Sequence, residues 1–138
     1  MALFGYLSSN SVIDNINFED FNLTLTSSNA TALAAVALSN DGVITGCSFN
    51  NIQLTMNSNV ASQSTEYSGF TTYDGVGVVA ADNNASGRIR NIEAHDIQLS
   101  IGGSRSYIGG IAGQNRGIIG GASAETDSVI IKGLKIAA

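Results

Sequence analysis

The chain has 138 residues, among them 16 glycines, no proline and no tryptophan, and its formal net charge is −5. Hydrophobic residues make up 43% and charged residues 12%, which supports a folded core, excludes wholesale disorder and does not fit the Glu-, Lys-, Leu- and Arg-rich composition of coiled coils and helix bundles. A nucleic-acid-binding protein needs a basic patch, which this composition does not offer. We therefore expect one all-β domain spanning residues 1–138.

Charge is distributed unevenly along the chain. Residues 1–87 contain seven acidic and no basic residues, whereas residues 88–138 contain six basic and four acidic ones. The simpler interpretation is that this uneven distribution arose by neutral drift in a weakly charged protein. The alternative is an electrostatic attraction between the acidic part of one chain and the basic part of another.

Residues 1–7 have the character of a strand. They lack the basic n-region and the long apolar stretch of a signal peptide, and no stretch of the sequence approaches the ~20 apolar residues that span a bilayer. Because the sequence begins abruptly in such a segment, we expect it to be a fragment of a longer protein, with no insertion into a membrane.

One pattern of apolar residues occurs three times in full and a fourth time in part. The full copies cover residues 11–25, 42–56 and 87–101, and the partial copy begins at residue 117. The equivalent isoleucines of the four copies are Ile13, Ile44, Ile89 and Ile119. Their spacing indicates a repeating unit of about thirty residues, with some fifteen extra ones in the second unit.

Apolar residues alternate with polar ones within each copy. In the first copy they are Ile13, Ile16, Phe18, Phe21, Leu23 and Leu25. Steps of two residues indicate a β-strand, and the two steps of three mark corners at which one extra residue turns the chain. A helix would need steps of three and four throughout, so each copy is predicted to form short strands joined by tight corners.

A short apolar segment and a polar turn precede each copy. The apolar segments cover residues 3–7, 35–38, 77–81 and 110–113. The turns cover residues 8–10, 39–41, 82–86 and 114–116. Each unit is therefore predicted to contain two or three strands.

Such a unit cannot bury its inward face alone, but it can do so by stacking on a copy of itself, with equivalent residues ~4.8 Å apart and hydrogen bonds between the coils. We expect the four isoleucines to form one inward ladder and Phe18, Phe49 and Ala94 to form another. The predicted fold is a parallel β-solenoid of about four coils of about thirty residues, roughly 20 Å tall. Residues 130–136 either close the fourth coil or open a fifth.

Two sets of residues fit the corners of this solenoid. Asp20, Asn51 and Asp96 occupy one equivalent corner, where Asn and Asp tolerate a left-handed backbone and bond their own turn. Gly42, Gly87 and Gly117 are expected to adopt positive φ, which costs glycine little.

Residues 109–119, which read GGIAGQNRGII, resemble the GLUG repeat, whose pattern is Gly-Gly-apolar-x-Gly-x-Asn-x-Gly-x-Ile. Residues 3–16 are similar to a looser form of it, and residues 34–47 and 77–92 keep its later Gly and Ile without the Gly-Gly opening. The resemblance implies a right-handed parallel β-helix in a bacterial surface or secreted protein, such as the repeat regions of adhesins and of IgA1-cleaving proteases. The His-Glu-x-x-His zinc motif does not occur in the sequence, so the resemblance carries no protease activity to this chain.

The excursion at residues 57–74 is the candidate binding element. It interrupts the repeat, and it contains Tyr67, Phe70 and Tyr73 among Ser, Thr and Gly. Insertions in solenoids map to loops, and aromatic residues on a polar loop suit the recognition of protein or sugar. The alternative interpretation is that these aromatic residues cover the side of the solenoid.

No catalytic residue, metal ligand or cofactor is predicted. His95, the single histidine, is expected to face solvent beside Glu93 and Asp96. Cys47, the single cysteine, cannot form an internal disulfide and is expected to be a small buried hydrophobe. The Asp20, Asn51 and Asp96 line indicates turn chemistry more than a calcium or catalytic site.

Three functions are compatible with these features. The leading hypothesis is a non-catalytic structural and adhesive repeat segment of a secreted or cell-surface bacterial protein, which presents loops to a host or cell-surface protein or glycan. The second is a carbohydrate-binding or carbohydrate-active β-helix that uses the 57–74 loop. The third is a self-assembling fibre unit, since uncapped coil ends expose unpaired strand edges and allow end-to-end self-association.

Overall fold

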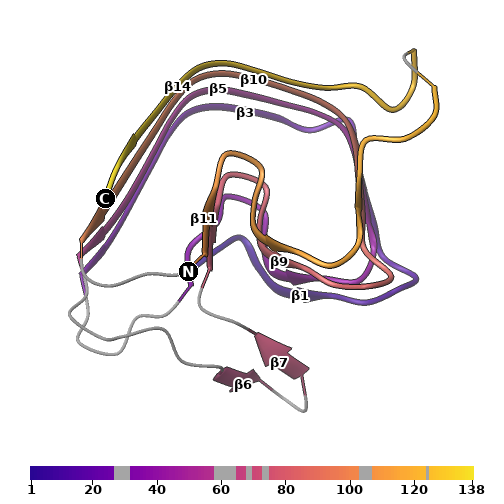
Figure 1. Ribbon diagram of the computed structural model, residues 1–138, viewed down its shortest axis with the longest axis horizontal. Coiled ribbons are helices and arrows are strands. Elements are labelled where there is room, and N and C mark those ends of the chain that lie inside the picture. Colours follow the sequence, from indigo (N-terminus) through magenta and orange to yellow (C-terminus); the bar gives the residue numbers. More distant parts are fainter. Residues whose placement is uncertain (27–31, 58–64, 68–69, 73–74, 103–106, 124) are drawn as a thin grey trace.

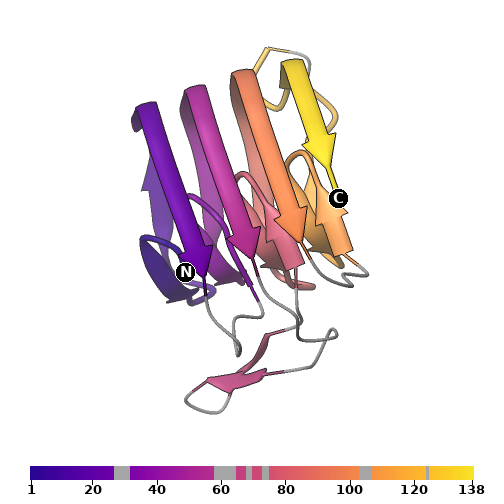
Figure 2. The ribbon, with the colours of Figure 1, turned by 90° about the vertical axis from the view of Figure 1, so that its left-hand side faces the viewer.

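The computed structural model describes residues 1–26, 32–57, 65–67, 70–72, 75–102, 107–123 and 125–138. In these residues the backbone winds into right-handed coils that stack along one axis (Figures 1 and 2). Coil 1 comprises residues 1–26, coil 2 residues 32–57, coil 3 residues 75–102 and coil 4 residues 107–137. Equivalent strands of successive coils pair in parallel, so the predicted four-coil parallel β-solenoid is confirmed.

The first part of each coil contributes one short strand to a parallel sheet. The order in this sheet is β1 (Phe4–Leu7), β4 (Ala37–Asn40), β9 (Ala80–Asn83) and β12 (Ala112–Asn115). A second pairing joins β8 (Gly75–Gly77) of coil 3 to β11 (Tyr107–Gly109) of coil 4. The strands follow the order of the coils, as stacking requires.

The second part of each coil forms the long outer wall. Coils 2 and 3 each supply a single bent strand, β5 (Val43–Asn57) and β10 (Arg88–Gly102), which pair with each other. In coil 1 this wall is divided into β2 (Val12–Asp14) and β3 (Asn17–Thr26), and both pair with β5. In coil 4 it is divided into β13 (Ile118–Ile119) and β14 (Val129–Ala137), and both pair with β10.

The predicted isoleucine ladder lies in this wall. Ile13 pairs with Ile44, Ile44 with Ile89, and Ile89 with Ile119. Ile44 and Ile89 are fully buried, and the two outer members are partly buried against the same core. The alignment of the repeat is therefore confirmed residue by residue.

The second predicted ladder carries the aromatic part of the core. Phe18 pairs with Phe49, and Phe49 with Ala94. The rings of Phe18 and Phe49 stack with centroids 4.8 Å apart and planes 1° from parallel. Parallel, in-register stacking imposes this face-to-face arrangement, because it places like side chains at the spacing of neighbouring strands.

The corners of the wall use residues with a left-handed backbone. Asp20, Asn51 and Asp96 have φ between 51° and 54°, which confirms the prediction for this corner. Gly133 of coil 4 occupies the same column and has φ 70°. The preceding corner is built in the same way, by Asn15, Gly46 and Asn91. Asn, Asp and Gly adopt this conformation at the lowest cost.

The prediction that Gly42, Gly87 and Gly117 adopt positive φ is wrong, because none of the three does. Instead, the absence of a side chain at these glycines lets the backbones of neighbouring coils approach closely. A Cβ on Gly42 would lie 2.5 Å from the carbonyl oxygen of Ser11, and a Cβ on Gly87 would fall on the side chain of Asn83 and 2.5 Å from the carbonyl oxygen of Asn40. Neighbouring coils therefore touch backbone to backbone at this turn.

A narrow tongue of chain fills the interior of coils 2 and 3. It consists of residues 32–37 in coil 2 and 75–81 in coil 3, and every residue in both segments is buried. Figure 1 shows this tongue near the centre of the cross-section, inside the outer wall. Because both faces of its backbone are covered, its sequence is continuously apolar or glycine and does not alternate.

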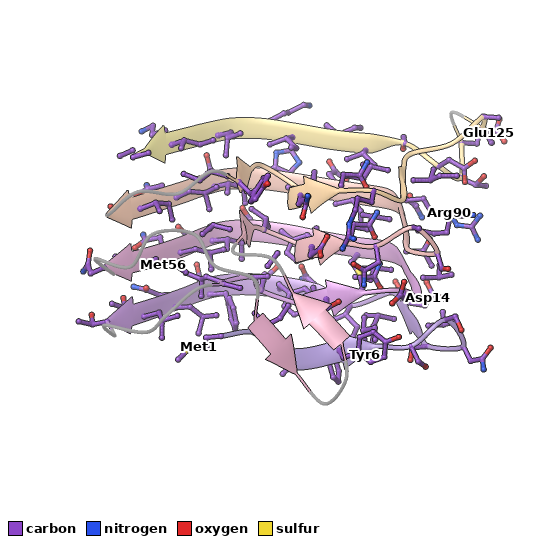
Figure 3. All side chains as sticks on the ribbon, turned by 60° about the horizontal axis from the view of Figure 1, so that its bottom comes forward. Met1, Tyr6, Asp14, Met56, Arg90 and Glu125 are labelled. Atoms are coloured by element: carbon purple, nitrogen blue, oxygen red, sulfur yellow. The ribbon has the colours of Figure 1, made fainter. Side chains whose placement is uncertain are left out.

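Residues 130–136 close the fourth coil. They belong to β14, which pairs with β10 from Ile92 and Val129 to Ser100 and Ala137. Between β13 and β14 the chain leaves the wall at residues 120–123 and 125–128, on the side where Figure 3 labels Glu125. Arg90 of coil 3 holds this segment, with its Nη1 atom 3.7 Å from Oδ1 of Asp127.

The close approach at Gly87 leads to a test by substitution. Gly87→Ala should lower the free energy of unfolding by about 2–3 kcal/mol, because the new methyl group must displace Asn83 and the Asn40 backbone. Gly102→Ala is the matched control, since its Cβ would meet its nearest atom, the carbonyl oxygen of Met56, at an ordinary 3.5 Å. Urea unfolding measures both. Equal effects of the two substitutions would contradict close packing at Gly87.

Candidate functional site

The 57–74 excursion contains a β-hairpin. Its strands β6 (Thr65–Tyr67) and β7 (Phe70–Thr72) are antiparallel, with Tyr67 directly opposite Phe70. Figure 2 shows the two strands beyond one side of the coil stack, clear of both sheets. Two of the three predicted binding residues are thus at paired backbone positions, and Tyr73 lies outside the described residues.

The excursion leaves and rejoins the solenoid at equivalent points. Thr26, Asn57 and Gly102 are in one column, and the next described pairings resume at Leu33 with Val76 and at Gly75 with Tyr107. The connection between coils 2 and 3 covers 58–74, whereas the connections before and after it cover only 27–31 and 103–106. The insertion therefore lengthens one connection without altering the register of the coils.

A buried ladder of asparagine side chains joins coils 2, 3 and 4. Nδ2 of Asn40 donates to Oδ1 of Asn83 at 2.8 Å, and Nδ2 of Asn83 donates to Oδ1 of Asn115 at 2.7 Å. Oδ1 of Asn40 accepts a bond from the backbone N–H of Gly42 at 3.1 Å. Asn40 and Asn83 have no exposed surface, so each amide replaces its lost water contacts with bonds to its column neighbours.

The strands extend further than the predicted turns allow. The prediction assigns residues 39–41 and 82–86 to polar turns, but Ser39 and Asn40 end β4, and Asp82 and Asn83 end β9. All four side chains are fully buried. The prediction rests on polar residues facing solvent, and the column of matching amides that buries them is visible only once the coils are stacked.

A second polar network adjoins this ladder. Nη2 of Arg116 lies 2.6 Å from Oδ2 of Asp82 and donates to Oδ1 of Asn84 at 2.7 Å. Nδ2 of Asn84 in turn donates to Oγ of Ser39 and to Oδ2 of Asp41, at 2.8 and 3.0 Å. The network thus links coils 2, 3 and 4 through their turns.

Tyr6 extends this network to coil 1. Its hydroxyl donates to Oδ2 of Asp41 at 3.1 Å. Desolvation and the Asp41 carboxylate raise the pKa of the Tyr6 phenol above its ordinary value of 10.0, so this group acts as a neutral donor at physiological pH. The contacts of this network run between coils, and we interpret the network as a set of polar interactions that holds successive coils together.

His95 and Cys47 occupy different places in the fold. His95 stands in the outer wall with Nε2 2.8 Å from Oε1 of the exposed Glu93. Cys47 is buried, its Sγ donates to the Thr45 carbonyl oxygen, and it pairs in register with Ile92. Burial raises the pKa of the Cys47 thiol, which keeps it protonated and poorly nucleophilic. Cys47 is the small buried residue that the sequence predicts.

The column of Asp20, Asn51 and Asp96 forms a corner of the outer wall. Nδ2 of Asn51 donates to Oδ1 of Asp20 at 2.7 Å, so an amide separates the two carboxylate positions along the column. Among the residues that the structure describes, no group of three or more His, Cys, Asp or Glu side chains could hold a metal ion. In the same part of the chain, no helix has the length and apolar character needed to cross a membrane.

The asparagine ladder leads to a prediction on stability. Asn83→Ala should lower the free energy of unfolding by about 2–4 kcal/mol, because it removes the acceptor of the buried Asn40 amide and the donor to Asn115. Asn17→Ala is the control, since Asn17 also bonds across a coil boundary, to Ser48, but is exposed. It should cost under about 0.5 kcal/mol. Similar losses in the two variants, measured by thermal or urea unfolding, would contradict a buried ladder.

Comparisons of the chain with protein-family models, with curated proteins and with solved structures gave no match. The resemblance to the GLUG repeat therefore stays a prediction from the residues that carry it, chiefly 109–119.

Proposed function

We propose that this chain is a non-catalytic structural and adhesive repeat segment, in which a rigid solenoid presents the 57–74 excursion for binding. The observation that carries the proposal is the unchanged register on either side of the excursion: Asn57 of coil 2 and Gly102 of coil 3 stay in one column although the whole of 58–74 intervenes before coil 3 begins. A segment that the scaffold does not need for its own stacking is free to serve recognition.

The solenoid has the features of a spacer. Its core runs unbroken through coils 2 and 3, where Ile52, Leu54, Ile97 and Leu99 are buried. The buried asparagine ladder and the network around Arg116 cross the same coil boundaries. Repeats that contact only their neighbours hold a constant distance between whatever they carry.

The proposal that the chain belongs to a secreted or cell-surface bacterial protein rests on the GLUG resemblance alone. Low charge and a sequence rich in Ser, Thr and Asn are compatible with that setting. The partner would be a host or cell-surface protein or a glycan, recognised through the aromatic positions Tyr67, Phe70 and Tyr73.

Replacing the excursion tests this proposal directly. In the variant, residues 58–74 give way to the shorter sequence that joins coils 1 and 2 at positions 27–31. The variant should keep a single cooperative unfolding transition with a midpoint within about 4 °C of the original. An unfolded variant would contradict the proposal, because the excursion would then be part of the cover of the core.

Binding assays distinguish the adhesive hypothesis from the carbohydrate-binding hypothesis. The intact chain is applied to a glycan array, beside the replacement variant and a Tyr67→Ala/Tyr73→Ala variant. A glycan signal that both variants lose would favour the carbohydrate-binding β-helix. Binding to immobilised cell-surface protein without a glycan signal, also lost in both variants, is the adhesive outcome. Binding that survives replacement of the excursion would contradict both hypotheses.

A further inference from the structure

Coils 1 and 4 expose apolar residues that their equivalents in coils 2 and 3 bury. In coil 1, Leu3 is 58% and Phe4 36% exposed, and in coil 4, Leu134 is 37% and Ile136 47% exposed. Ile136 shares a column with Leu54 and Leu99, which are almost completely buried. The exposure of Ile136 therefore comes from its place in the outermost described coil and not from the character of the position.

The strand edges at these two faces are unpaired within the described residues. β3 of coil 1 pairs only with β5, and β14 of coil 4 only with β10. Figure 2 shows the β6–β7 hairpin beyond one long side of the stack. Each face thus offers a row of backbone donors and acceptors together with an apolar stripe.

We propose that copies of this chain associate end to end, with coil 4 of one copy stacked on coil 1 of the next in the register that already joins the coils within one chain. The columns of the wall continue across such a junction. Ile131 would meet Phe18, Leu134 would meet Phe21, and Ile136 would meet Leu23, so apolar residues face apolar residues in these three columns.

Charge favours this head-to-tail order. One outer column of the wall contains, from coil 1 to coil 4, Glu19, Asn50, His95 and Lys132. When the column continues into the next copy, Lys132 becomes the neighbour of Glu19 at the ~4.8 Å spacing of paired strands. Glu19 and Lys132 are both exposed, so their side chains can meet across the junction.

Joining coil 1 to coil 1 is less favourable. Coil 1 carries Asp14, Glu19 and Asp20 and no basic residue, so this contact would bring like charges together, and like charges in contact oppose association. A head-to-tail contact uses two different surfaces, so it does not close on itself at a dimer. The expected assembly is an open-ended filament.

Sedimentation and light scattering at rising protein concentration test the assembly. The average mass should grow continuously, without a plateau at a dimer. Lys132→Glu and Glu19→Lys should each weaken association about tenfold by placing like charges at the junction. The two variants mixed together should associate as strongly as the original chain, because each restores an opposite charge to the other.

Lys135→Glu is the control, because it changes the net charge by the same amount as Lys132→Glu. Its column continues through Gln98, Gln53 and Asn22, so Lys135 would face a neutral residue of the next copy. Circular dichroism verifies that each variant is folded. A strict monomer at the highest concentration, a plateau at a dimer, failure of the mixed variants to recover, or an equal effect of Lys135→Glu would each overturn the proposal. None of these outcomes bears on the binding role of the 57–74 excursion.

Discussion

The structure depends on one constraint: every coil must match the residues of the coil beneath it, column by column. The column of Ile13, Ile44, Ile89 and Ile119 shows the simplest form, in which one residue type recurs. The stack of Phe18 on Phe49 shows the same rule for rings, and Asn40, Asn83 and Asn115 show it for buried amides. Apolar burial, hydrogen-bond satisfaction and turn geometry all follow from this single repeat.

The same constraint explains where the chain tolerates extra residues. The coils keep their columns although residues 58–74 and 120–128 intervene. Residues of the tongue do not have this freedom, because 32–37 and 75–81 are buried on both faces. Extra residues are therefore accommodated on the outside of the coils, where loops tolerate insertions.

Much of the fold was predictable from the sequence because residues that stack in one column recur at a regular spacing along the chain. The isoleucine ladder, the Phe18 ladder and the left-handed corner at Asp20, Asn51 and Asp96 all followed from aligned repeats. The prediction that Gly87 adopts positive φ was wrong. The contact between coils at Gly87 depends on the distance between two backbones, and this distance cannot be read from a single sequence. The network from Tyr6 to Arg116 was missed because its members come from all four coils. The buried ladder did have a signal in the sequence, because Asn40, Asn83 and Asn115 occupy equivalent places in three coils.

Parallel register is the claim on which the fold, the scaffold role and the assembly all rest, and methyl NMR tests it most directly. In protein labelled at the isoleucine methyl groups, the account predicts nuclear Overhauser effects from Ile44 to both Ile13 and Ile89, and from Ile89 to Ile119, because side chains in one column contact each other within about 4–5 Å. Contacts of Ile44 with neither Ile13 nor Ile89 would contradict it.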